Sequence, residues 1–197
     1  MVAWRGRRRL WIPCAVQPTS PGRCRIVLST EEGLVTATSL NHVSVSARDL
    51  EASARFYQEL FGMERVPTPN FGFPVVWMRV GDLQVHLFQR EVEAPTYHHL
   101  ALTVDDPDAV YRKAKELGVL DSRTNGHHLR ELPDGAMQLY LRDPSGNLVE
   151  VNYPDATQLA PDVRADLQRL EDVHPQDATN RRATLFLAHR ERQSRTA

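Results

Sequence analysis

Polar and hydrophobic residues alternate near residue 40 in the pattern of a strand. Val43 and Val45 fall on one face of residues 40–46, and His42 and Ser44 fall on the other. Successive side chains of a strand point to opposite faces, so this segment is predicted to be a strand that carries His42 on its more polar face.

A helix and a hairpin are expected to follow this strand. Asp49 is a suitable N-cap for an amphipathic helix, and Gly62 is a suitable stop. Two further strands are predicted at residues 75–80 and 83–88, joined by Gly81 and Asp82 in a two-residue turn. With one more strand between the helix and the hairpin, the segment is predicted to be a β-α-β-β-β module.

The second half of the chain repeats this order. At one constant offset His42 falls on His99 and Asp49 falls on Asp106, which indicates a duplicated structural module. The second copy is expected to contain a strand, a helix that stops at Gly118, an irregular strand and a closing hairpin, at residues 99–104, 106–118, 123–131, and 137–142 with 148–152. The fold class is therefore α+β, with two tandem modules.

The flanking segments differ from the modules in composition. Residues 1–38 contain several arginines and no sustained periodicity, so a mostly disordered extension is predicted. Residues 39–154 form the predicted domain, with modules at about 39–92 and 96–154. Residues 155–197 are predicted to be a helical tail, with amphipathic helices at about 161–171 and 176–191. These helices could pack on the core, cover a site or contact a second copy.

Hairpin geometry places particular side chains opposite one another. If Gly81 and Asp82 form the first turn, Trp77 lies opposite His86 and Arg79 lies opposite Gln84. In the second hairpin Tyr140 lies opposite Glu150. The corresponding positions of the two modules are then Trp77 and Tyr140, Arg79 and Arg142, and His86 and Glu150.

Four of the repeated positions carry metal-binding side chains, namely His42, His86, His99 and Glu150. If the two sheets curve toward each other, these residues converge near a pseudo-twofold axis. Histidines with a carboxylate suit Fe(II), Mn(II), Zn(II) or Ni(II), whereas calcium or magnesium would need more oxygen ligands. The sequence therefore predicts one divalent metal ion.

The remaining histidines give weaker signals. Alternation directs His98 away from the face of His99. His127 and His128 follow Asn125 and Gly126, which mark a turn, so both are expected in or beside a loop. From there His128 could reach the metal.

Charge and hydropathy exclude some classes of function. The formal net charge is −1, which argues against a protein that mainly binds nucleic acid or a membrane surface. No apolar run approaches the roughly 18 residues that span a bilayer. A cytoplasmic location is predicted.

At these residues the chain resembles the vicinal oxygen chelate superfamily, which includes glyoxalase I, methylmalonyl-CoA epimerase, fosfomycin- and bleomycin-resistance proteins, and extradiol dioxygenases. The resemblance covers about residues 40–153 and is carried by the segments at 42–45, 99–102 and 143–150. It implies paired βαβββ modules that form a metal-centred half-barrel, with Lewis-acid catalysis on neighbouring substrate oxygens.

The residue type at position 86 distinguishes the subfamilies of this superfamily. Glyoxalase I usually has Glu at this position and the epimerase usually has Gln, so His86 could be a fourth ligand or a general base. Extradiol dioxygenases resemble the chain from Leu139 to Glu150, but the expected upstream histidine is replaced by residues 131–133. Drug-binding proteins of the bleomycin-resistance type commonly lack metal ligands, whereas this set looks complete.

The resemblance implies a glyoxalase-like enzyme that transfers a proton on a small oxygenated substrate, of lyase or isomerase type. A ring-cleaving dioxygenase and a non-catalytic drug-binding protein are the alternatives. Glu150 and His86 are the predicted catalytic residues. A homodimer is expected, and the site could form within one chain or across the dimer. The predicted substrate-binding residues are Trp77, Arg79, Tyr140 and Arg142.

Overall fold

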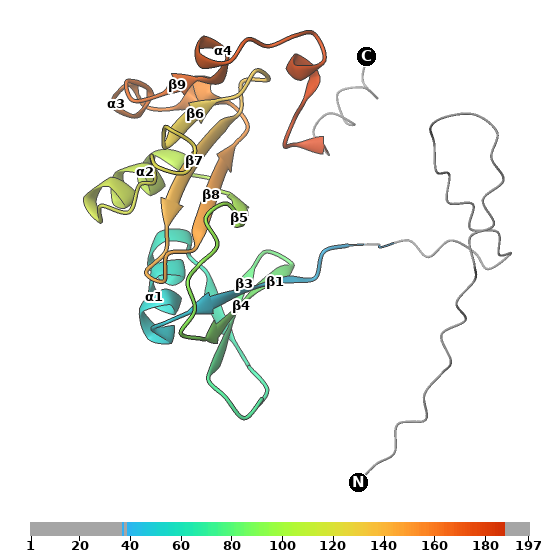
Figure 1. The fold of residues 1–197 in the computed structure, drawn as a ribbon, viewed down its shortest axis with the longest axis vertical. Coiled ribbons are helices and arrows are strands. Elements are labelled where there is room, and N and C mark those ends of the chain that lie inside the picture. The colour runs from blue at the N-terminus through green and yellow to red at the C-terminus, as the bar shows by residue number, and fades with distance from the viewer. Residues whose placement is uncertain (1–36, 38, 188–197) are drawn as a thin grey trace, which may run out of the picture. The chain divides into compact units, whose positions relative to one another are not determined.

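The computed structural model describes residue 37 and residues 39–187, and the part from Ser39 onward forms one compact unit. The extension predicted at residues 1–38 lies outside the described residues, apart from Ala37. The described chain contains a four-stranded sheet followed by a five-stranded sheet, each with one long helix (Figure 1). The α+β class and the two βαβββ modules are confirmed.

The first sheet is built by the first module in the order β1-β4-β3-β2. β1 runs parallel to β4, and the other pairs are antiparallel. The elements are β1 (His42–Ala47), α1 (Leu50–Phe61), β2 (Glu64–Val66), β3 (Val75–Val80) and β4 (Leu83–Gln89).

The second sheet repeats this arrangement and adds one strand, in the order β5-β8-β7-β6-β9. β5 runs parallel to β8, as β1 does to β4. The elements are β5 (His99–Thr103), α2 (Pro107–Glu116), β6 (Leu129–Glu131), β7 (Met137–Arg142), β8 (Leu148–Tyr153) and β9 (Gln168–Arg169). The irregular strand expected from residue 123 begins later, at Leu129.

The helix boundaries follow from the capping residues. The Asp49 carboxylate accepts a hydrogen bond from Ala52 N at 2.9 Å, and Asp106 does the same with Ala109 N at 2.9 Å. α1 ends at Gly62, whose φ of 62° is left-handed and favours glycine. The two modules therefore begin their helices with the same side-chain bond.

The predicted hairpin registers are confirmed. Trp77 pairs with His86 in β3 and β4, and Arg79 pairs with Gln84. Tyr140 pairs with Glu150 in β7 and β8.

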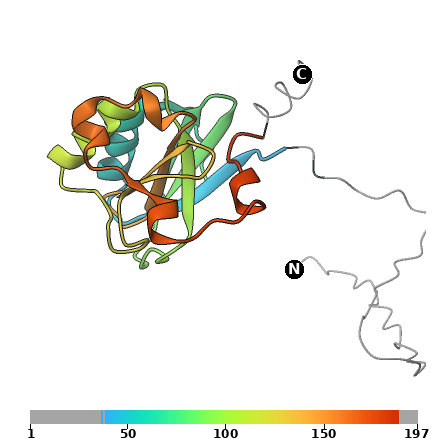
Figure 2. The same ribbon diagram turned by 90° about the horizontal axis from the view of Figure 1, so that it is seen from above.

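Both long helices lie on one side of the sheets (Figures 1 and 2). The strand side chains directed toward them form the core, including the fully buried Met78, Leu87, Leu139 and Val151. The alternate side chains lie on the opposite faces of the sheets. His42, His86, His99 and Glu150 all belong to these opposite faces.

A buried polar cluster joins the two modules. The Tyr57 hydroxyl in α1 donates to Asp143 Oδ2 at 3.1 Å, and Asn147 Nδ2 donates to the Ser46 carbonyl at 2.8 Å. The Ser53 and Ser145 hydroxyls lie 3.0 Å apart. The turn at residues 143–147 therefore fastens the second module to β1 and α1 of the first.

The tail differs from the prediction. The continuous helix expected at 161–171 is wrong, because α3 covers Pro161–Arg164 and β9 then pairs with β6 before α4 (Leu170–Val173) begins. Of the helix expected at 176–191, the described residues contain the short turn η2 (Asn180–Arg182) and one helical residue, Leu187. Residues 188–191 lie outside the described part. An earlier short turn, η1 (Ala156–Gln158), follows β8.

Across the described residues, no helix has the length and apolar character that a membrane crossing would require.

Candidate metal centre

The first pair of candidate ligands lies on adjacent parallel strands. His42 of β1 and His86 of β4 stack with ring centroids 4.2 Å apart and an interplanar angle of 14°. On its other side His86 stacks on Trp77, at 4.3 Å and 5°. His86 is therefore held between two rings, and it is only 6% exposed.

Neighbouring amides fix the ring nitrogens of this pair. His86 Nε2 lies 2.8 Å from Gln84 Oε1, and His42 Nδ1 lies 2.9 Å from Asn41 Oδ1. An amide oxygen can only accept, so these two nitrogens carry the hydrogens. In the neutral rings the lone pairs then belong to His42 Nε2 and His86 Nδ1, which is the state that a metal ligand requires.

The pKa of His86 is lowered. Burial disfavours the charged imidazolium, and the nearby His42 adds repulsion between two cations. Both effects favour a neutral imidazole, which can bind a metal ion or accept a proton.

The second pair lies on β5 and β8. His99 Nε2 is 3.2 Å from Glu150 Oε2, and His99 Nδ1 is 2.9 Å from the Tyr97 carbonyl oxygen. A carbonyl accepts, so Nδ1 carries a hydrogen. If the His99 ring is neutral, the lone pairs of His99 Nε2 and Glu150 Oε2 therefore point toward each other. A cation or a second proton on the ring satisfies both atoms, so this pair fits a bound metal ion.

The surroundings of Glu150 orient its carboxylate. Gln138 Nε2 donates to Glu150 Oε1 at 2.9 Å, which leaves Oε2 for His99. Glu150 is 3% exposed. Burial raises the pKa of Tyr140, and the negative charge of Glu150 raises it further, so Tyr140 stays protonated. Tyr140 also contacts His99 edge to face, with centroids 6.4 Å apart.

The structure brings the candidate ligands together as two pairs, one on each sheet. Among the described residues no three His, Cys, Asp or Glu side chains are grouped so that they could hold a metal ion. The convergence of all four positions within one chain is therefore not observed. Between the edges of β1 and β5 lies a cavity of about 320 Å³, lined by Ser44 and His99 among others.

Two buried polar atoms near the pairs lack hydrogen-bond partners. They are Trp77 Nε1, in the ring that stacks on His86, and Asn152 Oδ1, two residues beyond Glu150 on the same face of β8. Buried polar groups are almost always hydrogen-bonded. Both atoms are therefore exceptions to this rule, and each lies close to one of the two ligand pairs.

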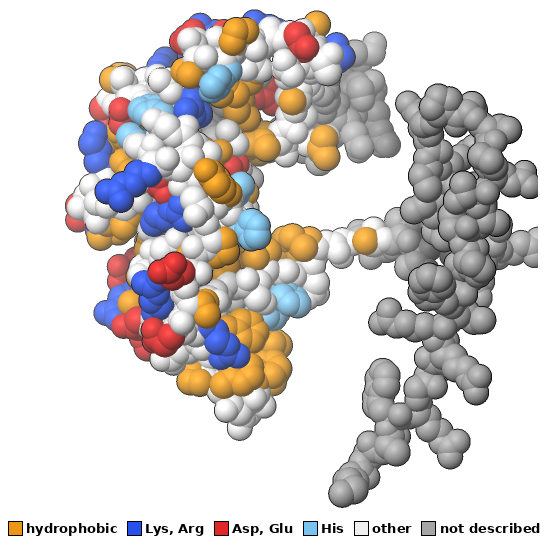
Figure 3. Space-filling view, in the orientation of Figure 1, with side chains coloured by type: hydrophobic (Ala, Val, Ile, Leu, Met, Phe, Trp, Pro, Cys, Tyr) orange, Lys and Arg blue, Asp and Glu red, His pale blue; other side chains and the backbone are white. Residues whose placement is uncertain are grey.

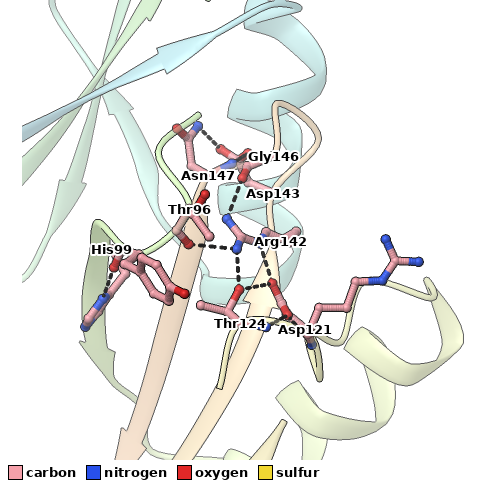
Figure 4. A network of polar contacts seen from close by, with 10 residues as sticks. Thr96, His99, Asp121, Thr124, Arg142, Asp143, Gly146 and Asn147 are labelled. Carbon is pink, nitrogen blue, oxygen red and sulfur yellow. Dashed lines mark hydrogen bonds and ion pairs between the residues drawn. The ribbon is translucent and has the colours of Figure 1, made fainter. Parts of the chain in front are cut away.

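The two candidate arginines are already engaged. Arg79 is exposed and donates to Glu64 at 2.5 Å. Arg142 donates to Asp121, and also to the Thr96 and Gly146 carbonyls at 2.9 Å each and to Thr124 Oγ1 at 2.5 Å (Figure 4). Arg142 thus fixes the loops around it.

Apolar side chains surround the first pair. Phe71 and Phe73 are 45% and 39% exposed, and the ring centroids of Phe71 and Trp77 lie 6.0 Å apart. Figure 3 shows apolar and histidine side chains gathered over β1 and the β3–β4 hairpin.

Gln84 and Gln138, which hold His86 and Glu150, were not among the predicted site residues. Their signal was the alternation of the strands, because Gln84 lies two residues from His86 and Gln138 lies two residues from Tyr140. Conversely His128, expected to be able to reach the metal, is bound instead to Ser122 and Asp166.

Known proteins are similar to this chain in sequence and in fold. Glyoxylase I 4 of Arabidopsis thaliana is 26% identical over 138 residues, covering 63% of this chain and 75% of the relative. Mitochondrial methylmalonyl-CoA epimerase of Mus musculus is 29% identical over 130 residues, covering 57% and 71%. A variant of the fosfomycin resistance protein FosX of Listeria monocytogenes, complexed with Mn(II), shares the fold with a TM-score of 0.51, 19% identity and coverage of 62% and 97%.

The family model described as Glyoxalase/Bleomycin resistance protein/Dioxygenase superfamily matches residues 39–151, which are the two modules. This match extends over more than half of the chain, so the chain belongs to that superfamily.

Proposed function

We propose that this protein is a divalent-metal-dependent enzyme of the glyoxalase-like branch, which moves a proton on a small oxygenated substrate in a lyase or isomerase reaction. The observation that carries the proposal is the pair of acceptor atoms, His99 Nε2 and Glu150 Oε2, only 3.2 Å apart. The names of the distant relatives, a glyoxylase and an epimerase, support the same class of reaction.

The proposed metal ligands are His42, His86, His99 and Glu150. This set suits Fe, Mn, Zn or Ni. When bound, such an ion supplies Lewis-acid stabilisation of negative charge on substrate oxygens.

We propose that a second copy of the chain completes the site. His42 and His86 of one copy would meet His99 and Glu150 of the other, because the two modules carry their ligands at corresponding positions. A twofold axis that places the first module of one copy against the second module of its partner then produces two equivalent sites.

Side chains of the protein itself are proposed to transfer the proton and bind the substrate. If the metal is held by the other three ligands alone, the neutral His86 can accept a proton instead, and Glu150, held by Gln138, can carry one. Trp77 and the protonated Tyr140 border the reacting group. Arg79 could bind a substrate anion, because leaving its exposed partner Glu64 costs little. Arg142 is occupied by its loop contacts, and a substrate role would require breaking them.

Metal content tests the assignment. Protein purified without chelators should contain metal, and His99→Ala should lose most of it while keeping its circular dichroism spectrum. The matched control is His98→Ala, because His98 is an exposed neighbouring histidine that is not among the proposed ligands. Full occupancy in His99→Ala would refute the ligand assignment.

Mixing two defective variants tests the shared site. A His42→Ala, His86→Ala double variant and a Glu150→Gln variant should each bind little metal alone. After joint refolding, mixed dimers should regain one intact site each. If mixing restores no metal while wild type binds it, the site forms within one chain.

A drug-binding protein of the bleomycin-resistance type is the second candidate. The exposed Phe71 and Phe73 beside Trp77 favour it, because such a surface can stack on a planar ligand. Protein that neither retains nor takes up divalent metal but binds a planar aromatic drug would favour this candidate.

A further inference from the structure

A second group of reactive side chains lies away from the metal ligands, where the second module meets the tail. It consists of Ser122, His128 and Asp166. Ser122 Oγ is 2.7 Å from His128 Nδ1, and His128 Nε2 is 2.9 Å from Asp166 Oδ2. A hydroxyl, an imidazole and a carboxylate are thus joined in the order of a nucleophile, a base and the group that orients the base.

The hydrogen-bond directions suit nucleophile activation. The pKa of Asp166 is lowered, because hydrogen bonds from Tyr111 and His128 outweigh the opposing effect of burial. The ionised carboxylate can only accept, so His128 Nε2 carries the hydrogen. In the neutral ring Nδ1 then has the lone pair, and the Ser122 hydroxyl donates to it.

The surroundings hold this arrangement in place. The Tyr111 hydroxyl also donates to Asp166 Oδ2, at 2.5 Å, and its ring lies 6.2 Å from the His128 ring. His127 Nε2 lies 2.7 Å from the Asp166 carbonyl oxygen. The His128 side chain is 13% exposed and that of Asp166 is 35% exposed, whereas Ser122 is open to solvent. The base is therefore sheltered, and the nucleophile is accessible.

The loop that carries Ser122 is also fixed. Asp121 accepts hydrogen bonds from the backbone N–H groups of Arg123 and Thr124, at 2.8 and 2.9 Å.

We propose that Ser122 is a nucleophile toward activated esters of small carboxylic acids, with His128 as its general base and Asp166 as a positioning residue. Oγ attacks the carbonyl carbon and its proton passes to His128 Nδ1. The ester C–O bond breaks and the leaving alcohol takes that proton. Water then repeats the sequence on the acyl-serine, releasing the carboxylic acid and restoring the hydroxyl.

The test uses p-nitrophenyl acetate and the full chain, both with and without chelator. We expect Ser122 to be acetylated much faster than Ser39, an exposed serine near the start of β1, when peptides are mapped by mass spectrometry. Chelation should not change the rate, which separates this activity from the proposed metal enzyme. Ser122→Ala should abolish the labelling, and Ser39→Ala should not affect it.

Asp166→Asn separates catalysis from a purely structural role. It should lower the acetylation rate of Ser122 by about 100-fold, the range typical of losing general-base assistance. Thermal unfolding is measured on the same samples. Acetylation of Ser122 no faster than that of Ser39, or an Asp166→Asn variant that unfolds earlier but acetylates at the wild-type rate, would overturn the proposal. If Asp166→Asn does not fold, the comparison of Ser122 with Ser39 in the wild-type protein still decides, because it needs no variant.

Discussion

Asp121 is a buried carboxylate whose partners come from the residues that follow it and from Arg142 at the end of β7. It is 6% exposed and bonded to Arg142, Thr124 and the backbone of Arg123. Burial alone raises its pKa, but the hydrogen bonds from Thr124, Arg142 and Arg123 together lower it below 3.8. The ionised form therefore stabilises the fold.

Replacing this carboxylate should show the effect. Asp121→Asn should reduce the free energy of unfolding by about 2 kcal/mol at neutral pH, because Arg142 loses its charged partner. Since the folded-state pKa is depressed, the stabilisation is present above about pH 3.8 and is lost as the pH falls through the folded-state value. The difference from wild type in urea denaturation should therefore shrink in acid. Asp82→Asn, in an exposed turn, should cost almost nothing.

At the scale of single residues, the sequence predicted the positions of residues in strands better than it predicted the partners of their side chains. The opposition of Trp77 and His86 followed from a two-residue turn, because the turn fixes the register. The stacking of His42 on His86 and the bond from Gln138 to Glu150 depend on rotamers and on neighbouring strands, so the residue pattern did not reveal them.

The starts of the two long helices were predicted correctly from their capping residues. Asp49 and Asp106 cap α1 and α2 through the same bond at the same distance. Local chemistry determines such boundaries, because the cap satisfies an N–H group that the helix itself leaves unpaired.

The two caps should be energetically equivalent. Asp49→Ala and Asp106→Ala should each lower the free energy of unfolding by about 1 kcal/mol, as measured by denaturant titration. Asp105→Ala removes a neighbouring exposed carboxylate without removing a cap, and should lie near wild type. A large difference between the two cap variants would contradict the equivalence of the modules.

The tail shows where the element prediction failed. Its apolar positions fit a helical period, but Val163 is fully buried in α3 and the chain then extends to pair β9 with β6. Contacts between distant parts of the chain overrode the local pattern. These include the bidentate bond from Arg112 to Asp162 and the bond from Arg130 to Gln168.

The buried polar cluster that joins the two modules contributes to the stability of the whole domain. Tyr57 donates to Asp143, and burial, with the nearby charge of Asp143, raises the pKa of Tyr57 well above its usual value. Tyr57→Phe should lower the free energy of unfolding by about 1–2 kcal/mol, because Asp143 stays buried with one bond fewer. In Tyr153→Phe the lost partner is the exposed Gln158, so the cost should be about 0.5 kcal/mol or less.

Metal binding should stabilise the assembled protein. Adding Mn(II) or Zn(II) to chelator-treated wild type should raise the unfolding temperature, because a ligand bound to the native state stabilises it by mass action. The same addition should leave His99→Ala unchanged. If two copies share each site, the rise should also increase with protein concentration, which differential scanning calorimetry can measure.

At the scale of the molecule, the modules and their order could be predicted because duplication repeats every signal. The separation of the four candidate ligands into two pairs could not, because strand patterns do not specify how one sheet is placed against the other. The joint at Tyr57 and Asp143 involves residues far apart in the chain, and no local pattern marks it.

In the second sheet β9 covers the edge of β6, and among the described residues the first sheet has no corresponding extra strand beside β2. β9 pairs with β6 through Gln168 and Arg169, whereas the outermost strand of the first sheet is the three-residue β2. Unpaired strand borders are templates for aggregation. In a chain shortened before Pro161, β6 would become an exposed edge strand. Self-association through this edge would then compete with folding, so the tail also protects the protein from aggregation.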